Sequence, residues 1–174
     1  SRVTISQNDK AVLKKLREII KSEYPINNKL RIRPNGNRKG NTLEISSPMF
    51  KYALVSYFKI PEGKKNFIVK VPEQVINSDR NSKLAFLAAS IEGDGSWPPN
   101  STNLRMTSEE YIYICYKLLR ELGYSAIWSK LSQENLWMMQ LCSKRDICWF
   151  IYECTPYLIA INKVENFIGI NYRN

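Results

Sequence analysis

The chain has 174 residues, which suits one large or two small domains, and its 44% hydrophobic and 24% charged content is typical of a globular protein. It contains no apolar run long enough to cross a bilayer and no histidine, which excludes Ser-His-Asp hydrolysis and most zinc enzymes. The net charge is +10, and its excess lies in residues 1–80, with 17 Lys and Arg against 7 Asp and Glu, a bias that favours a polyanionic partner.

The first half of the sequence predicts the order strand, helix, strand, strand, helix. Asn8 or Asp9 suits the N-cap of the first helix, and Pro48 suits the first turn of the second. Apolar residues recur at helical spacing after the first cap, and they alternate with polar residues in the strands. The five predicted elements are residues 3–6, 9–24, 29–33, 42–46 and 48–58.

The second half predicts the same order of elements, at residues 104–107, 108–122, 126–132, 136–142 and 144–153. Ser108 suits the N-cap of its first helix, and Gly123 suits the end of that helix. Two local echoes support a repeat with an offset of about 100 residues, counted from Val3 to Leu104. The segments 43–47 and 139–143 resemble each other, as do 16–18 and 119–121.

A helix of small and apolar residues precedes the second set of elements and ends in an acidic pair. Glu92 and Asp94 lie in its last turn, and Gly95 suits its end. Carboxylates are unfavourable at a helix C-terminus, because that end already carries partial negative charge. A divalent cation would offset this cost, since Mg²⁺ and Ca²⁺ prefer carboxylate oxygens.

This stretch, Leu-Ala-Ala-Ser-Ile-Glu-Gly-Asp-Gly at residues 87–95, resembles the motif that names the LAGLIDADG homing endonucleases. The resemblance implies an α+β fold of two pseudo-symmetric αββαββα repeats whose antiparallel sheets form a saddle over double-stranded DNA. Residues 1–80 would hold the first repeat and a linker, and residues 81–174 the second repeat. Segments 63–65 and 71–73 resemble the family's connection between repeats.

The first repeat lacks its motif helix and first strand, which the offset would place about 5 to 20 residues before Ser1. Three explanations remain open: a trimmed chain, a shorter natural protein, or a missing piece supplied by another chain. The expected assembly is therefore a monomer with pseudo-two-fold symmetry or a complex with a chain that supplies the missing helix. No membrane partner is expected.

The strand at 29–33 is the clearest local signal for DNA binding. Lys29, Arg31 and Arg33 share one face, because side chains alternate along a strand, and Arg38 and Lys39 follow on the loop. A cationic sheet face suits a major groove, where arginine reads guanine. Glu44 either accepts from cytosine or pairs with Arg31 or Arg33. Other candidates for nucleic-acid contact are Arg2, Thr4, Arg105 and Lys130; Trp128, on the same predicted face as Lys130, either contacts DNA or packs in the core.

The resemblance implies that Asp94 binds Mg²⁺ at the scissile phosphate and that a lysine lies nearby. Lys65 matches that lysine in the first repeat, with Lys64 as the alternative, whereas the matching position of the second repeat is apolar. Glu92 has a structural role in the family and is not assigned to the metal. One motif helix gives half of a two-metal site, so double-strand cleavage depends on the missing helix.

Three functions follow from these observations. The first is a Mg²⁺-dependent site-specific DNA endonuclease. The second is a non-cleaving binder on the same scaffold, either an intron maturase that binds intron RNA or a transcriptional regulator. The third is an unrelated basic domain with a coincidental motif. Four scattered cysteines without a CxxC pair favour an intracellular, reducing compartment, either cytoplasm or organelle matrix.

Overall fold

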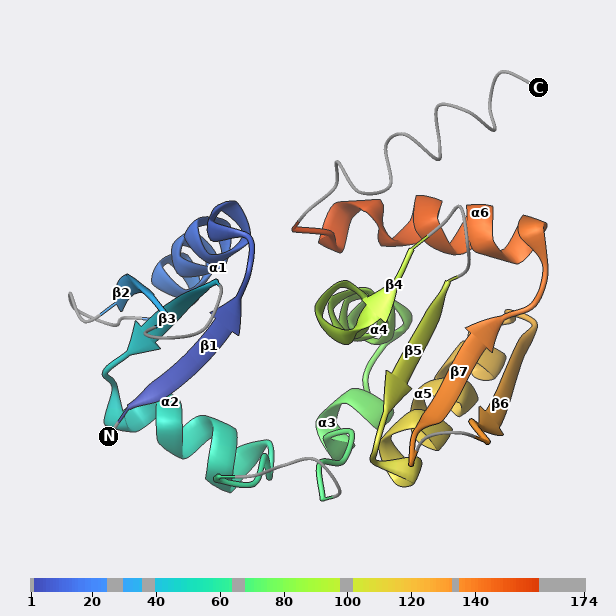
Figure 1. The fold of residues 1–174 in the computed structure, drawn as a ribbon, viewed down its shortest axis with the longest axis horizontal. Coiled ribbons are helices and arrows are strands. Elements are labelled where there is room, and N and C mark those ends of the chain that lie inside the picture. Colours follow the sequence, from blue (N-terminus) through green and yellow to red (C-terminus); the bar gives the residue numbers. More distant parts are fainter. Residues whose placement is uncertain are drawn as a thin grey trace. The chain divides into compact units, whose positions relative to one another are not determined.

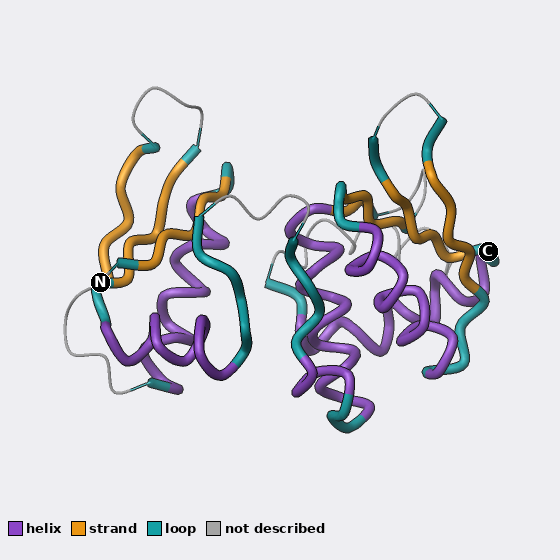
Figure 2. The backbone as a smooth tube through the Cα atoms, turned by 90° about the horizontal axis from the view of Figure 1, so that it is seen from below, coloured by secondary structure: helices purple, strands orange, loops and turns teal. Residues whose placement is uncertain are grey.

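The computed structural model describes residues 2–24, 30–35, 40–63, 68–97, 102–132 and 135–159. The chain divides into two compact units, Ser1–Lys59 and Ile60–Asn174 (Figure 1). Each unit combines an antiparallel sheet with helices, as an α+β fold requires. Within each unit the strands lie to one side and the helices to the other (Figure 2).

The first unit is built on a three-stranded antiparallel sheet with strand order β1-β3-β2. The side chain of Asp9 begins the first helix by accepting a hydrogen bond from the Ala11 amide at 2.8 Å. Leu13 and Ile20 of that helix pack against Leu43 and Ile45 of the central strand. The elements are β1 (Val3–Gln7), α1 (Lys10–Glu23), β2 (Leu30–Pro34), β3 (Asn41–Ile45), α2 (Pro48–Tyr52) and a π-helical continuation, η1 (Ala53–Tyr57).

The second unit holds the larger core, in which helices cover one face of a four-stranded antiparallel sheet of order β4-β5-β7-β6. Leu87 and Ile91 of the motif helix meet Ile112 and Leu119 of α5 and Phe150 of α6 in one buried cluster. The elements are α3 (Glu73–Ile76), α4 (Arg80–Asp94), β4 (Gly95–Ser96), β5 (Asn103–Met106), α5 (Glu109–Glu121), β6 (Ala126–Lys130), β7 (Trp137–Leu141), α6 (Lys144–Cys154) and η2 (Thr155–Tyr157).

The predicted repeat is confirmed by the strand order. The order β1-β3-β2 of the first unit matches β5-β7-β6 of the second, and a helix follows the first strand in each. The caps match as well: Asp9 and Ser108 begin α1 and α5, and Ser47 and Ser143 begin α2 and α6. The described part of the first unit contains no counterpart of α4 and β4.

The strand register corrects the alignment of the two copies. Leu43 pairs with Ile5, and Met139, which matches Leu43, pairs with Leu104. Leu104 therefore corresponds to Ile5 rather than to Val3. The likeness of 43–47 to 139–143 is structural, because both segments lead from the central strand to a capped helix. The likeness of 16–18 to 119–121 does not reflect equivalent positions in the fold, because the two segments lie at different distances from the matched caps Asp9 and Ser108.

The segment between the repeats packs on the second unit. Val71 is buried in the second core, and Val75 and Ile76 of α3 pack against it. The second compact unit accordingly begins at Ile60, ahead of the repeat boundary that the sequence suggests at residue 80. Among the described helices, none combines the length and the apolar character that a bilayer crossing demands.

Candidate nucleic-acid interface and catalytic carboxylate

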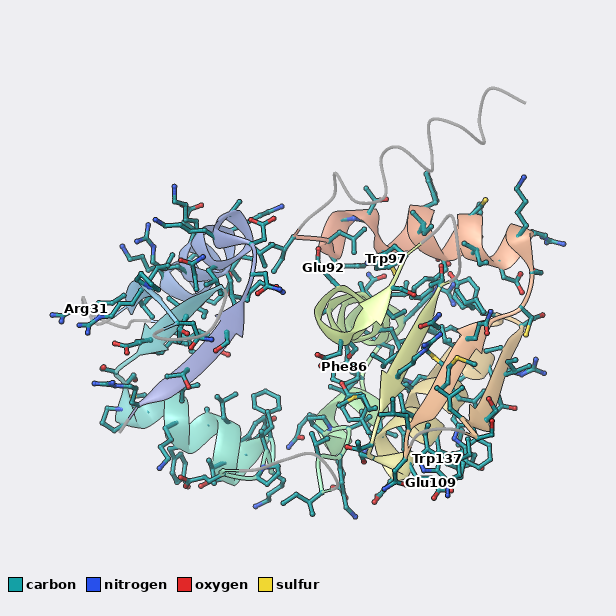
Figure 3. The ribbon with its side chains drawn as sticks, in the orientation of Figure 1. Arg31, Phe86, Glu92, Trp97, Glu109 and Trp137 are labelled. Atoms are coloured by element: carbon teal, nitrogen blue, oxygen red, sulfur yellow. The ribbon has the colours of Figure 1, made fainter. Side chains whose placement is uncertain are left out.

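The first sheet has one apolar face and one polar face. Ile5, Leu43 and Ile32 form a cross-strand row on the face that carries the core. Because side chains alternate along a strand, the neighbouring rows lie on the opposite face. Those rows pair Thr4 and Arg31 with Glu44, and Ser6 and Arg33 with Thr42. Figure 3 shows Arg31 extending from β2 to the outside of the unit.

Glu44 lies at the centre of this polar face and is shared by two arginines. Its Oε1 lies 3.3 Å from a guanidinium nitrogen of Arg2, and its Oε2 lies 3.5 Å from Nε of Arg33. The sequence leaves open a pairing of Glu44 with Arg31 or Arg33; the structure pairs it with Arg33, and it adds Arg2, which the sequence reasoning missed. Both arginines are more than half exposed, so each ion pair is weak and a phosphate or base can displace it.

The same face is hollowed. A surface depression of about 300 Å³ is lined by Arg2, Arg31, Arg33, Glu44 and Ser46. Three guanidinium groups and one carboxylate give it a net positive charge. Three further predicted contacts, Lys29, Arg38 and Lys39, lie outside the described residues, as do Lys64 and Lys65.

The corresponding face of the second sheet is mostly neutral. Its two central rows are Asn103, Gln140 and Ile127, and Arg105, Met138 and Ser129. Arg105 is exposed there, as predicted.

The prediction that Lys130 lies on this face is wrong. Lys130 and Trp128 share a face with Ala126, and Trp128 packs against the core. The ammonium of Lys130 lies 5.7 Å from the ring centre of Trp137. Both faces of β6 carry apolar residues, so alternation by itself could not decide which one faces the helices. The pairing with Met139 and Leu141 decides it.

The motif helix is fixed at both ends. The Asp79 side chain accepts from the Ser82 amide at 2.8 Å and begins α4. At the other end α4 passes directly into β4, the edge strand of the sheet. A Cβ atom at Gly95 would lie 2.4 Å from the Asn103 carbonyl oxygen and 2.8 Å from that of Ile91. Only glycine lets the helix end pass this close to β5.

The two acidic residues of the motif have different surroundings. Glu92 is 9% exposed, and its carboxylate accepts a hydrogen bond from the Ile159 amide at 3.0 Å. It therefore ties the motif helix to the segment after η2, which agrees with leaving it out of the metal site. Asp94 is the last residue of α4 and is exposed. Its carboxylate is thus available to a ligand at the edge of the second sheet.

A tyrosine that the sequence reasoning missed lies close to the end of the motif helix. The hydroxyls of Tyr111 and Ser90 lie 2.8 Å apart, and the ring of Tyr111 meets that of Phe86. Burial raises the pKa of Tyr111, and Cys115 and Asp94 act in the same direction. Tyr111 is therefore neutral at physiological pH and braces the α4 face that ends at Asp94. No sequence pattern marks it, because its neighbours in α5 include two further tyrosines.

The donor set at Asp94 suits a cation that is bound jointly with a substrate. Within the described residues, no group of three or more His, Cys, Asp or Glu side chains is placed to hold a metal. A dedicated protein cage is therefore absent from this part of the chain. Mg²⁺ commonly binds one or two carboxylates together with water and substrate phosphates, and Asp94 supplies one such carboxylate.

Comparisons with known proteins bear on the family and the fold of the chain. A family model described as a LAGLIDADG-like domain matches residues 81–154. An A-type ATP synthase subunit of Pyrococcus abyssi is 30% identical over 130 residues, which cover 72% of this chain and 12% of that protein. The chain thus spans about an eighth of the length of this curated relative.

Two solved structures share the fold. A crystal structure of I-DmoI in complex with DNA and Mn has a TM-score of 0.69 and 16% identity, and the match covers 88% of this chain and 80% of that one. The N-terminal LAGLIDADG domain of DUF199/WhiA has a TM-score of 0.53 and 15% identity, with 88% and 70% covered. A LAGLIDADG-like family model thus matches residues 81–154, and the chain shares its fold with I-DmoI and with the LAGLIDADG domain of WhiA.

Proposed function

We propose that the chain is a DNA-binding protein of the homing-endonuclease type, which cleaves phosphodiester bonds with a divalent cation. The observation that carries this proposal is the exposed carboxylate of Asp94, at a helix end that runs straight into the edge strand of a sheet. A helix C-terminus disfavours a carboxylate, so a cation is the natural counter-charge. I-DmoI, which has the same fold, crystallises with DNA and with Mn, Ca or Mg.

The first sheet would supply most of the binding energy. Its polar face presents Arg2, Arg31 and Arg33, and Glu44 neutralises one charge. Arginine binds guanine O6 and N7 with two hydrogen bonds, which contribute about 1–3 kcal/mol of discrimination each. Arg38 and Lys39 would add phosphate contacts, and Lys29 would share the face of Arg31 and Arg33; all three lie outside the described residues.

The cleavage step would depend on Asp94 and on a lysine. Asp94 would hold the cation against a backbone phosphate, and Lys65 would lie near the same phosphate. A bound cation lowers the pKa of its water and stabilises the departing oxygen. The described residues supply one such carboxylate, so cutting both strands would need a second one from a further motif helix.

A non-cleaving nucleic-acid binder, such as an intron maturase or a regulator, is the second candidate. The basic first half of the chain favours it, because an excess of Lys and Arg suits a polyanionic partner whether or not that partner is cleaved. We infer no ATPase activity from the match to part of an ATP synthase subunit. The sequence has no GxxxxGK[ST] phosphate-binding loop, and the matched stretch is a small part of that relative.

Cleavage of a plasmid library with randomised inserts, in Mg²⁺ and in Mn²⁺, tests the proposal. We expect the unaltered chain to cut at least one strand, Asp94→Asn to bind without cutting either strand, and Glu109→Gln to behave like the unaltered chain. Glu109 is a matched control, because it is also an exposed carboxylate, but it lies at the N-terminal end of α5, whereas Asp94 lies at the C-terminal end of α4 (Figure 3). Salt-sensitive binding without any cleavage would establish the binder instead. Equal cleavage by Asp94→Asn would refute the catalytic role.

A further inference from the structure

We propose that the two sheets read chemically different half-sites, and that the second reads A·T pairs through Ile127 and Gln140. This inference rests on the proposed DNA-binding function and deepens it. It names the class of sequence that the neutral half of the protein recognises and the residues that set this preference.

The strand registers show which residues of the two sheets correspond. In the first sheet, Glu44 of the central strand lies between Thr4 and Arg31. In the second sheet, Gln140 of the central strand lies between Asn103 and Ile127. Both rows lie on the face opposite the helices. Ile127 therefore occupies the position of Arg31, and Gln140 that of Glu44.

The change in chemistry between these positions is large. A guanidinium and a carboxylate in the first sheet are replaced by a branched hydrocarbon and a neutral amide in the second. In the next row, Ser129 occupies the position of Arg33, and Met138 occupies the position of Thr42. The trend is reversed only at one position of that row, where Arg105 occupies the position of Ser6. The arginines suit guanine, whereas the row of Asn103, Gln140 and Ile127 carries no arginine or lysine.

Ile127 is 49% exposed, whereas other branched aliphatic side chains of the same sheet, Leu104 and Leu141, are almost fully buried. Exposure of this apolar side chain costs free energy unless something covers it. In the major groove the thymine C5-methyl group is the apolar feature that distinguishes bases, and aliphatic side chains contact it. Glutamine binds adenine N6 and N7 with two hydrogen bonds. Ile127 and Gln140 are cross-strand neighbours. Ile127 suits the thymine methyl group and Gln140 suits the adenine edge, so together they suit A·T pairs.

Selection of binding sites from a random duplex library is the first step of the test. The unaltered chain should select a site with one half rich in G·C and the other rich in A·T. Replacing thymine by uracil then removes only methyl groups. In the A·T half it should weaken binding about fourfold per contacted methyl. The same replacement should have no effect on Ile127→Ala, and Gln140→Ala should relax selection at adenine positions.

Ile19→Ala is the matched control, because Ile19 is also a half-exposed isoleucine, at 42%, but lies on α1. It should retain the full response to uracil. An equal response of the unaltered chain and Ile127→Ala would overturn this inference and leave DNA binding intact. Failure to select any DNA would overturn both the inference and the proposed function. Concentration-dependent self-association that Ile127→Ala abolishes would show that the exposed side chain serves a protein contact instead.

Discussion

Replacing Gly95 by alanine tests the junction between the motif helix and its sheet. The backbone of Gly95 has φ −104° and ψ −167°, which alanine adopts without strain, so any effect must be steric. The new Cβ would lie 2.4 Å from the Asn103 oxygen and within 2.9 Å of two atoms of Ile91, all of them backbone. Ordinary van der Waals contact of a Cβ atom is 3.4–4 Å, so the junction must open by about 1 Å.

Such overpacking costs about 1–3 kcal/mol, partly offset by about 0.4–1 kcal/mol from the stiffer unfolded chain. We expect Gly95→Ala to lower the free energy of unfolding by about 1–2 kcal/mol, measured by urea denaturation. Because Asp94 precedes the displaced residue, cleavage should fall more than DNA affinity.

Gly93→Ala is the control for this substitution. A Cβ at Gly93 meets nothing within 4 Å, and the residue lies inside α4. It should raise the free energy of unfolding by about 0.5 kcal/mol, since alanine is the better helix former. Equal effects of the two substitutions, or an unchanged stability of Gly95→Ala, would contradict the close approach of α4 to β5.

Two further predictions concern the second unit. Ser108→Ala should cost about 1–2 kcal/mol in urea denaturation, because the hydroxyl caps α5 and also donates to the Val69 carbonyl at 2.8 Å. Burial opposes ionisation of Glu153, but hydrogen bonds from Tyr124 and Arg80 outweigh it and lower the pKa of Glu153. Because this pKa is lower in the folded state than in the unfolded state, the ionised Glu153 stabilises the fold at a pH above its unfolded pKa. That contribution to stability is lost as the pH falls below about 4.5. We therefore expect Glu153→Gln to be less stable than the unaltered chain near neutral pH, and to lose less unfolding free energy on acidification. Parallel curves of unfolding free energy against pH for the two proteins would contradict this.

The elements of the fold could be predicted because their signals are local. Asp9, Ser108 and Ser143 are caps followed by apolar residues at helical spacing, and the structure begins α1, α5 and α6 there. The π-helical turn at Ala53–Tyr57 could not be predicted, since its sequence continues the helical pattern of α2 without a break.

The faces of the strands were harder to predict than the strands themselves. In β2 the alternation of Arg31 and Arg33 with Leu30 and Ile32 leaves one possible orientation. In β6 both faces carry apolar residues, and the cross-strand partner, which is remote in sequence, decides that Trp128 faces the core. The same limit applies to the site: Asp94 is marked by its motif, but Tyr111 is brought to the motif helix only by tertiary packing.

The binding of duplex DNA through the polar face of the first sheet can be measured directly with two variants of equal charge. One removes Arg31 and Arg33 from that face, and the other removes Lys10 and Lys14, which are exposed on α1. We expect the substitution of both arginines by alanine to weaken affinity at least tenfold, by about 1–3 kcal/mol for each lost base contact. Substitution of both lysines should have a much smaller effect that disappears at high salt. Equal losses for the two variants would show that net charge alone binds the DNA, and would contradict the assignment of this face as the interface.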